Sequence, residues 1–405
     1  MTGTDARSGP PLTGFAVASF LAFGALLVLY GSNGSELRAA LDLSYADLGL
    51  LGACLSLGLG VGIVLAGPLV DRWPRRPLYV AACSCVVVAC AVLGPWTGFR
   101  GLMVSTILIG FGAGFYETVL NALVVETHGT EAPRRLVFIH CGATLAASLT
   151  PLLFAVLRDS IELAWYDTFR IAGAAHLLLI AATRFVPMRP PPAHADFGDA
   201  AAFEVDPTRG AGPPARRAPG EDRLAFAALC LATFAYVGVE SALTLFVADH
   251  ARTDLGLDAA RAAGTISAFW TGLLVGRLGV GLAPRAPGAG TTAALAALAA
   301  SIVLGFGRGW IGPPELAMAA TGFFLGGVFP VMIGLAGQLL PNRAGLAVGL
   351  AGGLGSLGGF VVPWLTGLIA AIDGLSSALA ALSGWLGLLV AGATFVRLRR
   401  PAPRG

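Results

Sequence analysis

Two carboxylates stand inside long apolar segments of this 405-residue chain. Glu117 has no charged neighbour for sixteen residues before it, back to Arg100, or for eight residues after it, to Glu126. Glu240 lies seventeen residues after Arg223, so both acids are expected near the middle of their segments. An acid at the centre of a bilayer costs about 2.5–3.5 kcal/mol on insertion scales, and it usually faces a cavity or a partner. Both are predicted to be proton-coupling groups of a polar cavity, with a purely structural role as the alternative.

Polar and small side chains recur at helical spacing around each acid. One stripe runs at i, i+4, i+7 and i+11 through Gly110, Gly114, Glu117 and Asn121. A second runs at i, i+3, i+7 and i+11 through Thr233, Tyr236, Glu240 and Thr244. Residues at these spacings share one face of a helix, so each acid is expected to belong to a cavity-lining face. The hydroxyl and amide groups could instead bond to neighbouring helices or to the backbone one turn back.

The aromatic and hydrogen-bonding side chains of the apolar segments suit a small polar solute. A tyrosine or tryptophan ring can stack on the apolar face of a sugar, while amide and carboxylate groups bond to its hydroxyls. The predicted substrate-binding residues are Asn33, Tyr116, Asn121, His140, Tyr236, Thr244 and Trp270.

Composition indicates an integral membrane protein whose surroundings are a lipid bilayer. The chain is 56% hydrophobic and 12% charged, and its apolar runs reach the ~20 residues that a membrane-spanning helix requires. A net charge of +3 gives no support for a nucleic-acid partner. The six cysteines fall inside apolar segments without metal-ligand spacing, so neither a disulfide framework nor a metal site is expected. The sequence contains no nucleophile elbow or phosphate loop, and we predict no enzymatic activity and no cofactor.

The order of apolar and polar segments predicts an all-α membrane protein with twelve transmembrane helices in two pseudo-symmetric six-helix bundles. The first six spans are expected at 14–30, 47–69, 78–97, 102–126, 135–157 and 164–186, and the last six at 224–249, 261–283, 290–307, 315–340, 344–369 and 375–397. The stretch between them is rich in Pro, Ala, Asp, Arg and Gly and is predicted to be a flexible linker. The predicted organisation is a tail at 1–13, a bundle at 14–187, a linker at 188–222, a bundle at 223–398 and a tail at 399–405.

The distribution of arginine predicts the orientation. If both ends and the linker face the cytoplasm, that side holds 19 arginines, Arg277 among them, and the opposite side holds 7. Cytoplasmic loops carry the excess of positive charge in most membrane proteins. Both termini are therefore predicted to be cytoplasmic, in a multi-pass protein of the cytoplasmic membrane.

The loop between the second and third spans contains a recognisable motif. The stretch from Gly67 to Arg76 reads Gly-Pro-Leu-Val-Asp-Arg-Trp-Pro-Arg-Arg and resembles the G-x-x-x-D-R-x-G-R-R signature of the major facilitator superfamily, with Pro74 in place of the second glycine. The resemblance implies a gate in which a carboxylate engages a helix N-terminus or an arginine in one conformation and releases it in another. The gating residues that it implies are Gly67, Asp71, Arg72, Arg75 and Arg76. A role for the arginines as cytoplasmic anchors only is the alternative.

Further segments resemble the fucose permease type of sugar/proton symporter within that superfamily. They are Gly114–Asn121, Tyr236–Glu240, Phe269–Arg277, Gly326–Pro330 and Gly358–Pro363. The resemblance implies that Glu117 is a protonatable acid of the cavity and that Asn121 bonds to the substrate. Well-known members carry a second acid in the first span, where this chain has none, and Glu240 is our hypothesis for the group that supplies this charge.

The expected function is therefore secondary active transport of a small, sugar-like solute by alternating access, with protons as the coupling ion. An exporter of amphiphilic or drug-like compounds by proton antiport is the first alternative, although the fifth span lacks the Gly-Pro-Gly-Gly cluster typical of such antiporters. A non-transporting receptor or scaffold on the same fold is the second. A monomer is expected.

Overall fold

The computed structural model describes residues 9–70, 72–128, 132–188, 219–283, 287–340 and 344–399, and every regular element in these ranges is a helix. Asp71, most of the predicted linker (189–218) and parts of both predicted tails (1–8 and 400–405) lie outside the described residues.

The first half of the chain contains six long helices and two short ones. The long helices are α1 (Gly9–Ser32), α3 (Tyr45–Val70), α4 (Arg75–Ala91), α5 (Phe99–His128), α6 (Ala132–Ile161) and α7 (Trp165–Ala182). The short ones are α2 (Gly34–Leu41), which follows α1, and η3 (Thr183–Phe185), a 3-10 turn that follows α7. The second half contains α8 (Pro219–Thr253), α9 (Ala259–Leu282), α10 (Ala289–Gly307), α11 (Pro314–Leu325), α12 (Val328–Leu339) and α13 (Ala344–Arg399).

Local sequence determines where several of these helices begin and end. α3 begins at a capping box, in which Asp47 Oδ2 accepts a hydrogen bond from the Ser44 backbone at 2.9 Å and Ser44 Oγ accepts one from the Asp47 backbone at 3.1 Å. α9 begins after Asp258, whose carboxylate accepts a hydrogen bond from the Arg261 backbone at 2.8 Å. α13 is kinked at Gly374, where φ is 82°, a conformation that glycine adopts without the steric cost of a Cβ atom.

Twelve membrane crossings result. In the described ranges, nine stretches are long and apolar enough to span a bilayer, and one of them is the kinked α13. α13 contributes two crossings, one on each side of Gly374, and α4 and α7, at 17 and 18 residues, supply the remaining two. The tenth crossing consists of α11 and α12, which are separated at Gly326 and Gly327. The predicted all-α fold with twelve transmembrane helices is confirmed.

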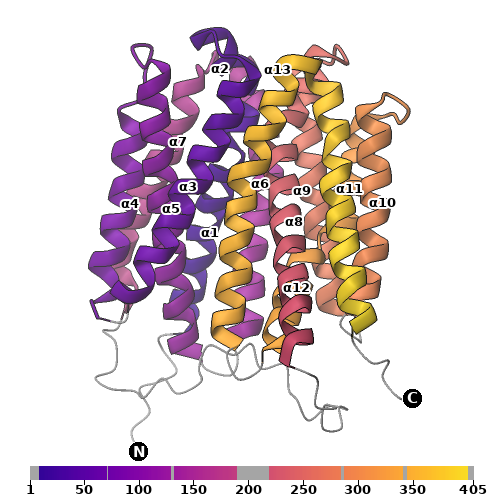
Figure 1. Ribbon diagram of the computed structural model, residues 1–405. Helices are drawn as coiled ribbons and strands as arrows, with labels where there is room; N and C mark the ends of the chain where they lie inside the picture. The colour runs from indigo at the N-terminus through magenta and orange to yellow at the C-terminus, as the bar shows by residue number, and fades with distance from the viewer. Residues whose placement is uncertain are drawn as a thin grey trace, which may run out of the picture.

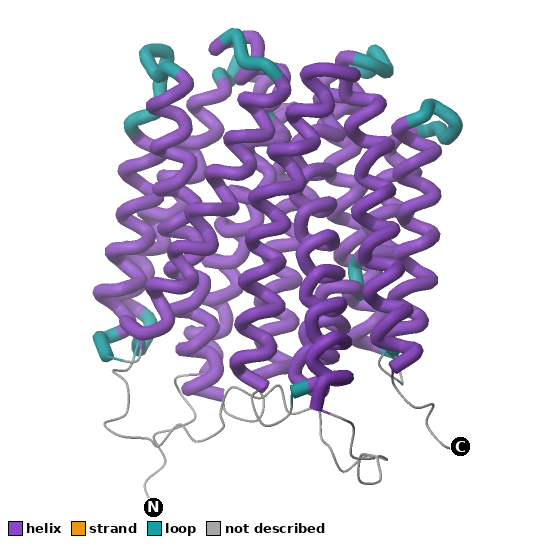
Figure 2. The backbone as a smooth tube through the Cα atoms, viewed as in Figure 1, coloured by secondary structure: helices purple, strands orange, loops and turns teal. Residues whose placement is uncertain are grey.

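The two halves lie beside each other as two groups of helices, indigo to magenta for the first and pink to yellow for the second (Figure 1). α3 packs against α13 and α6 packs against α9, and these two pairs make the most extensive contacts between the halves. Short connections cap the helices at both ends of the bundle (Figure 2). Below, the side that carries α2 is named the outer side and the opposite one the inner side, following the arginine distribution.

Glycines allow equivalent helices of the two halves to pack at backbone contact. A Cβ atom on Gly114 of α5 would lie 2.3 Å from the Leu59 carbonyl oxygen of α3. A Cβ atom on Gly322 of α11 would lie 2.0 Å from the Phe269 carbonyl oxygen of α9. These are the second and fourth crossings of each half, so the same close approach of small residues occurs twice, as expected for pseudo-symmetric bundles.

Gly322→Ala is therefore expected to lower the free energy of unfolding by about 1–3 kcal/mol, because the added methyl group forces α9 and α11 apart. Thermal unfolding of the purified protein in lipid nanodiscs measures the change. Gly334→Ala is the matched control, since a Cβ atom at Gly334 in α12 meets nothing within 4 Å. Equal melting temperatures for the two variants would contradict the backbone contact.

Candidate functional site

A cavity of about 70 Å³ lies between the two halves. Five helices contribute to its walls, α1 and α3 from the first half and α8, α9 and α13 from the second. The lining residues are Leu27, Tyr30, Gly31, Gly52, Leu55, Ser56, Leu59, Glu240, Ser241, Thr244, Leu245, Trp270 and Pro363. A carboxylate, several hydroxyl-bearing side chains and an indole thus share a small, largely apolar space between the halves.

Glu240 is the acidic residue of this cavity, and its carboxylate has two side-chain partners. Tyr236, one turn earlier on α8, donates its hydroxyl to Glu240 Oε2 at 2.5 Å. Arg277 of α9 donates to the same oxygen at 3.4 Å. Thr244, one turn later, donates its hydroxyl to the Glu240 backbone carbonyl at 2.7 Å. Three members of the predicted stripe on α8 therefore form one hydrogen-bonded group.

Glu240 has a charged partner, Arg277, that the sequence did not reveal. Arginine count alone assigned Arg277 to the cytoplasmic side. In the structure Arg277 belongs to α9 and its guanidinium forms an ion pair with Glu240, with the arginine side chain 23% exposed and the glutamate 18%. Arg277 also donates to the Thr144 hydroxyl of α6 at 2.9 Å, so it links the two halves.

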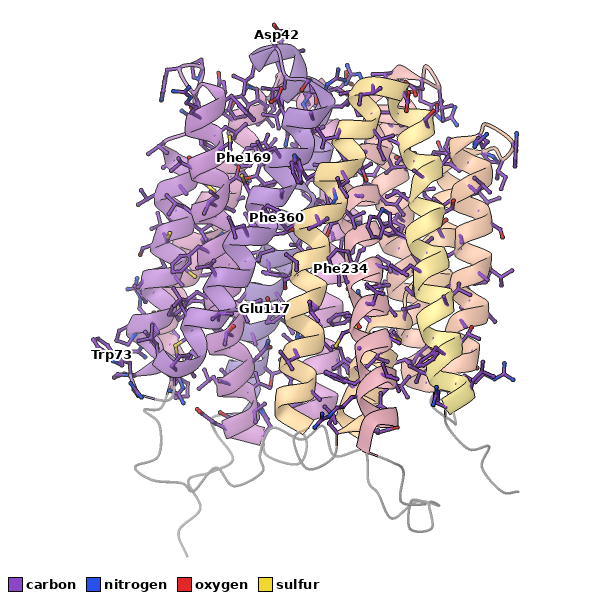
Figure 3. All side chains as sticks on the ribbon, viewed as in Figure 1. Asp42, Trp73, Glu117, Phe169, Phe234 and Phe360 are labelled. Carbon is purple, nitrogen blue, oxygen red and sulfur yellow. The ribbon has the colours of Figure 1, made fainter. Side chains whose placement is uncertain are left out.

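Glu117 lies on α5 in the first half, and Figure 3 places it between Asp42, near one end of the bundle, and Trp73, near the other. Its side chain is partly exposed, and no basic group in the described part of the chain forms an ion pair with it. Asn121 follows one turn later, and its Oδ1 is buried without a hydrogen-bond partner among the described residues. Glu117 does not line the cavity that Glu240 lines, so the structure does not bring the two acids together.

Of the seven predicted substrate-binding residues only Thr244 and Trp270 line the cavity, and Tyr116 and Asn33 are among the five that do not. Tyr116 is fully buried in the first half, where its hydroxyl is 3.2 Å from His176 Nε2. Asn33 is buried between α1 and α2, where it donates to the Thr168 hydroxyl at 3.0 Å and accepts from Arg158 at 2.6 Å. Tyr30, three residues before Asn33, contributes to the cavity wall instead. Helical spacing alone could have identified Tyr30, because Leu27, Tyr30 and Gly31 share a face.

The remaining predicted residues divide between the cavity and the helices beside it. Trp270 lines the cavity, and its indole N–H has no hydrogen-bond partner within the ranges that the structure describes. His140 of α6 packs edge-on against Phe20, with ring centres 4.5 Å apart. One turn and two turns beyond His140, Thr144 and Ser148 continue along α6, and the Ser148 hydroxyl is 2.5 Å from that of Thr271 on α9.

On the outer side, ion pairs connect the halves. Asp249 near the end of α8 is fully buried and accepts from Arg38 at 2.9 Å and from Ser35 at 2.5 Å, both on α2. Arg252 pairs with Glu36 at 2.9 Å. These contacts fasten α2 of the first half to α8 of the second. These ion pairs are not evident from the sequence, because Arg38 and Asp249 are 211 positions apart in the chain.

On the inner side, the arginines of the motif between α3 and α4 differ in their surroundings. Arg75 is 1% exposed and forms an ion pair with Glu126 of α5. Arg76 donates to the Val186 carbonyl at 3.0 Å, whereas Arg72 is exposed. A Cβ atom on Gly67 would meet nothing within 4 Å. Two of the arginines thus tie the start of α4 to the end of α5 and to Val186, which follows η3.

The protein is a multi-pass membrane protein of the two-bundle class. It has two six-helix halves with a cavity between them, and ion pairs join the halves on one side. The chain belongs to the Major Facilitator Superfamily, whose sequence model matches residues 15–314.

Among curated proteins, the chain is 31% identical over 139 residues to the multidrug resistance protein MdtM of Salmonella typhimurium, a segment that covers 33% of each chain. It is 22% identical over 141 residues to the probable metabolite transport protein YDR387C of Saccharomyces cerevisiae, covering 35% of this chain and 25% of that protein. The matched segments thus span a third or less of each relative's length.

Solved structures share the fold over nearly the whole length. A D-xylose-proton symporter superposes with a TM-score of 0.77 at 16% identity, covering 98% of this chain and 99% of that one. The nucleoside transporter NupG superposes with a TM-score of 0.72 at 12% identity, covering 96% and 99%. A bacterial homologue of the lysosomal transporter Spinster, in an inward-facing and occupied conformation, gives 0.69 at 16% identity, covering 96% and 95%.

Proposed function

We propose that the protein is a secondary active transporter that moves a small, sugar-like solute across the cytoplasmic membrane by alternating access, coupled to protons through Glu117 and Glu240. Both termini are proposed to be cytoplasmic. The observation that carries the proposal is the cavity between the halves with a carboxylate in its wall. Membership of the Major Facilitator Superfamily supports it, as does the resemblance of five segments to the fucose permease type.

The proposed cycle uses the contacts between the halves. With the outer ion pairs formed, the cavity is closed from the outer side, and solute exchanges with the inner side. When these pairs separate and the halves rock, the cavity opens outward. A proton on a membrane-embedded acid removes its charge and lowers the cost of closing the cavity around a solute, and the release of the proton on the inner side resets the cycle.

Glu117 is the group whose chemistry best suits proton coupling. Its carboxylate has no ionic partner in the described ranges, so protonation removes a negative charge that no neighbouring cation balances. Glu240 faces Arg277, and protonation there also releases a guanidinium. Protonation therefore neutralises an unpaired charge at Glu117, whereas at Glu240 it breaks an ion pair.

A second candidate function is export of amphiphilic compounds by proton antiport. The observation that favours it is the 31% identity to MdtM over a third of the chain. The two functions differ in the direction in which proton movement and solute movement are coupled. A sugar symporter makes the external medium more alkaline when sugar is added to de-energised cells, whereas an antiporter gives dye efflux that depends on the proton gradient.

Glu117→Gln is expected to abolish concentrative uptake while leaving downhill exchange largely intact, because the amide keeps the hydrogen bonds but cannot carry the proton. Uptake of radiolabelled L-fucose and D-xylose into proteoliposomes, with and without an inward proton gradient, measures the effect. We expect at least a tenfold loss of gradient-driven accumulation, equivalent to about 1.4 kcal/mol of driving force.

Glu162→Gln is the control variant, since Glu162 is an exposed acid in the connection between α6 and α7. If Glu117→Gln and Glu240→Gln both retained full pH-dependent, concentrative uptake, the proposed coupling would be wrong. Proton-dependent dye efflux without sugar uptake would favour the exporter.

A further inference from the structure

Arg277 directs its charged group toward the membrane interior. It lies five residues before α9 ends at Leu282 on the inner side. Arginines near a membrane surface usually extend outward to reach water. Helical side chains lean toward the N-terminus of their helix, however, and the N-terminus of α9 is on the outer side. The guanidinium therefore reaches Glu240 and Thr144, which lie in the middle parts of α8 and α6.

The donors of Arg277 are only partly used. A guanidinium carries five N–H donors in a planar fork that matches a carboxylate with two parallel hydrogen bonds. Here Nη1 donates to Thr144 at 2.9 Å, Nη2 approaches Glu240 at 3.4 Å, and Nε is buried without a partner among the described residues. Charge-assisted bonds of this type are normally about 2.7–2.9 Å long. The contact with Glu240 is therefore a long, single-oxygen one.

The shorter bond of Glu240 is the one to Tyr236. Both Tyr236 and Arg277 donate to Oε2, but the hydroxyl is at 2.5 Å and the guanidinium is at 3.4 Å. A pair whose only purpose was to stabilise the fold would be expected to use both carboxylate oxygens and a short distance. Tyr236 thus holds Glu240 in place. Arg277 does not line the cavity of Trp270 and Glu240, but its side chain is 23% exposed and the geometry of its fork is not matched by a second carboxylate oxygen.

We propose that Arg277 binds the anionic group of the transported solute, and that the solute is a small organic carboxylate such as a sugar acid. The inference rests on the proposed transport function and specifies its substrate class. Trp270 lies on the same helix, seven residues or about 10 Å before Arg277, and on the same face. Its ring lines the cavity and its indole N–H is unpartnered within the described ranges, so it suits the uncharged end of such a solute.

Charge balance supports this substrate class. An anion that binds to Arg277 replaces Glu240, which becomes neutral when it takes up a proton. The positive charge of Arg277 and the negative charge of the solute then balance each other, and the solute and the proton move together. A cationic solute would instead meet Arg277 at close range, at a cost set by like-charge repulsion in a poorly hydrated site.

Matched pairs of ligands that differ only in the carboxylate test the proposal. The pairs are D-galacturonate with D-galactose, D-glycerate with glycerol, and benzoate with benzyl alcohol. Their affinities for the purified full-length protein in nanodiscs follow from thermal shifts, since a ligand that binds only the native state raises the melting temperature. The variants are Arg277→Gln, Arg277→Lys and, as a control for net charge, Arg308→Gln, which removes an exposed arginine at the end of α10.

In the wild type, at least one acid is expected to bind about ten- to a hundredfold more tightly than its neutral partner, as for a hydrogen-bonded ion pair. Arg277→Gln should abolish this preference, Arg277→Lys should keep part of it, and Arg308→Gln should keep all of it. The proposal is overturned if no acid is preferred, or if Arg277→Gln retains the preference. In either event, the proposed transport function would still be supported if a proton gradient drove uptake of a neutral sugar and if this uptake required Glu117.

Discussion

Arg38→Ala is expected to open the outer side of the protein. Asp249 is fully buried, and without Arg38 its carboxylate keeps only the Ser35 hydroxyl as a side-chain partner within the described residues. Breaking a buried ion pair by removing one partner costs about 3–5 kcal/mol. Arg38 is 25% exposed, so we expect a value near the lower limit, about 3 kcal/mol, which is roughly a hundredfold change in the ratio of open to closed molecules.

Because the pair joins α2 to α8, its loss is expected to appear as separation of the halves and not as unfolding of either. Pulsed electron resonance between spin labels at Ala40 and Ala260 measures this, since both are exposed residues at the outer ends of the two halves. The labels require a background in which the six free cysteines are replaced.

Arg100→Ala is the control, because Arg100 is an exposed arginine near the start of α5 on the same side. The double variant Arg38→Met with Asp249→Leu is expected to close again, because apolar side chains of similar volume remove the stranded charge. An unchanged distance distribution in Arg38→Ala would show that the ion pair does not hold the outer side closed.

Neutralising both members of the Glu240–Arg277 pair is expected to restore stability that the single variants lose, but not transport. Glu240→Gln and Arg277→Gln should each lower the free energy of unfolding by about 1–2 kcal/mol, since each leaves one charge without its counter-charge in the membrane. The double variant should regain about 1 kcal/mol of this loss, because it leaves no stranded charge. Uptake should stay at least tenfold below wild type in all three.

A double-mutant cycle tests this prediction. Thermal unfolding in nanodiscs and proteoliposome uptake are measured for the wild type, both single variants and the double variant. Recovery of stability without recovery of uptake would separate the structural part of the pair from its part in transport. Wild-type uptake by the double variant would show that the pair serves the fold alone.

Local sequence was sufficient to predict the helices because each is determined by its own residues. A run of apolar side chains long enough to cross the bilayer must form a helix, since lipid offers no partner for backbone polar groups. Ser44 with Asp47, Asp258 and Gly374 act within a few residues of the helix ends that they specify. The predicted twelve crossings in two halves followed from this local physics.

The sequence by itself also determined that Glu117 and Glu240 would lie inside long apolar helices, because both are far along the chain from the flanking charges. Only the tertiary structure decided what they face. Helical spacing gives the face of one helix but not the neighbour that packs against it. Tyr116 and Asn33 were predicted to bind the substrate, and yet they do not line the cavity. The ion pairs Glu240–Arg277 and Asp249–Arg38 join residues 37 and 211 positions apart, and only the packing of the helices brings their charges together.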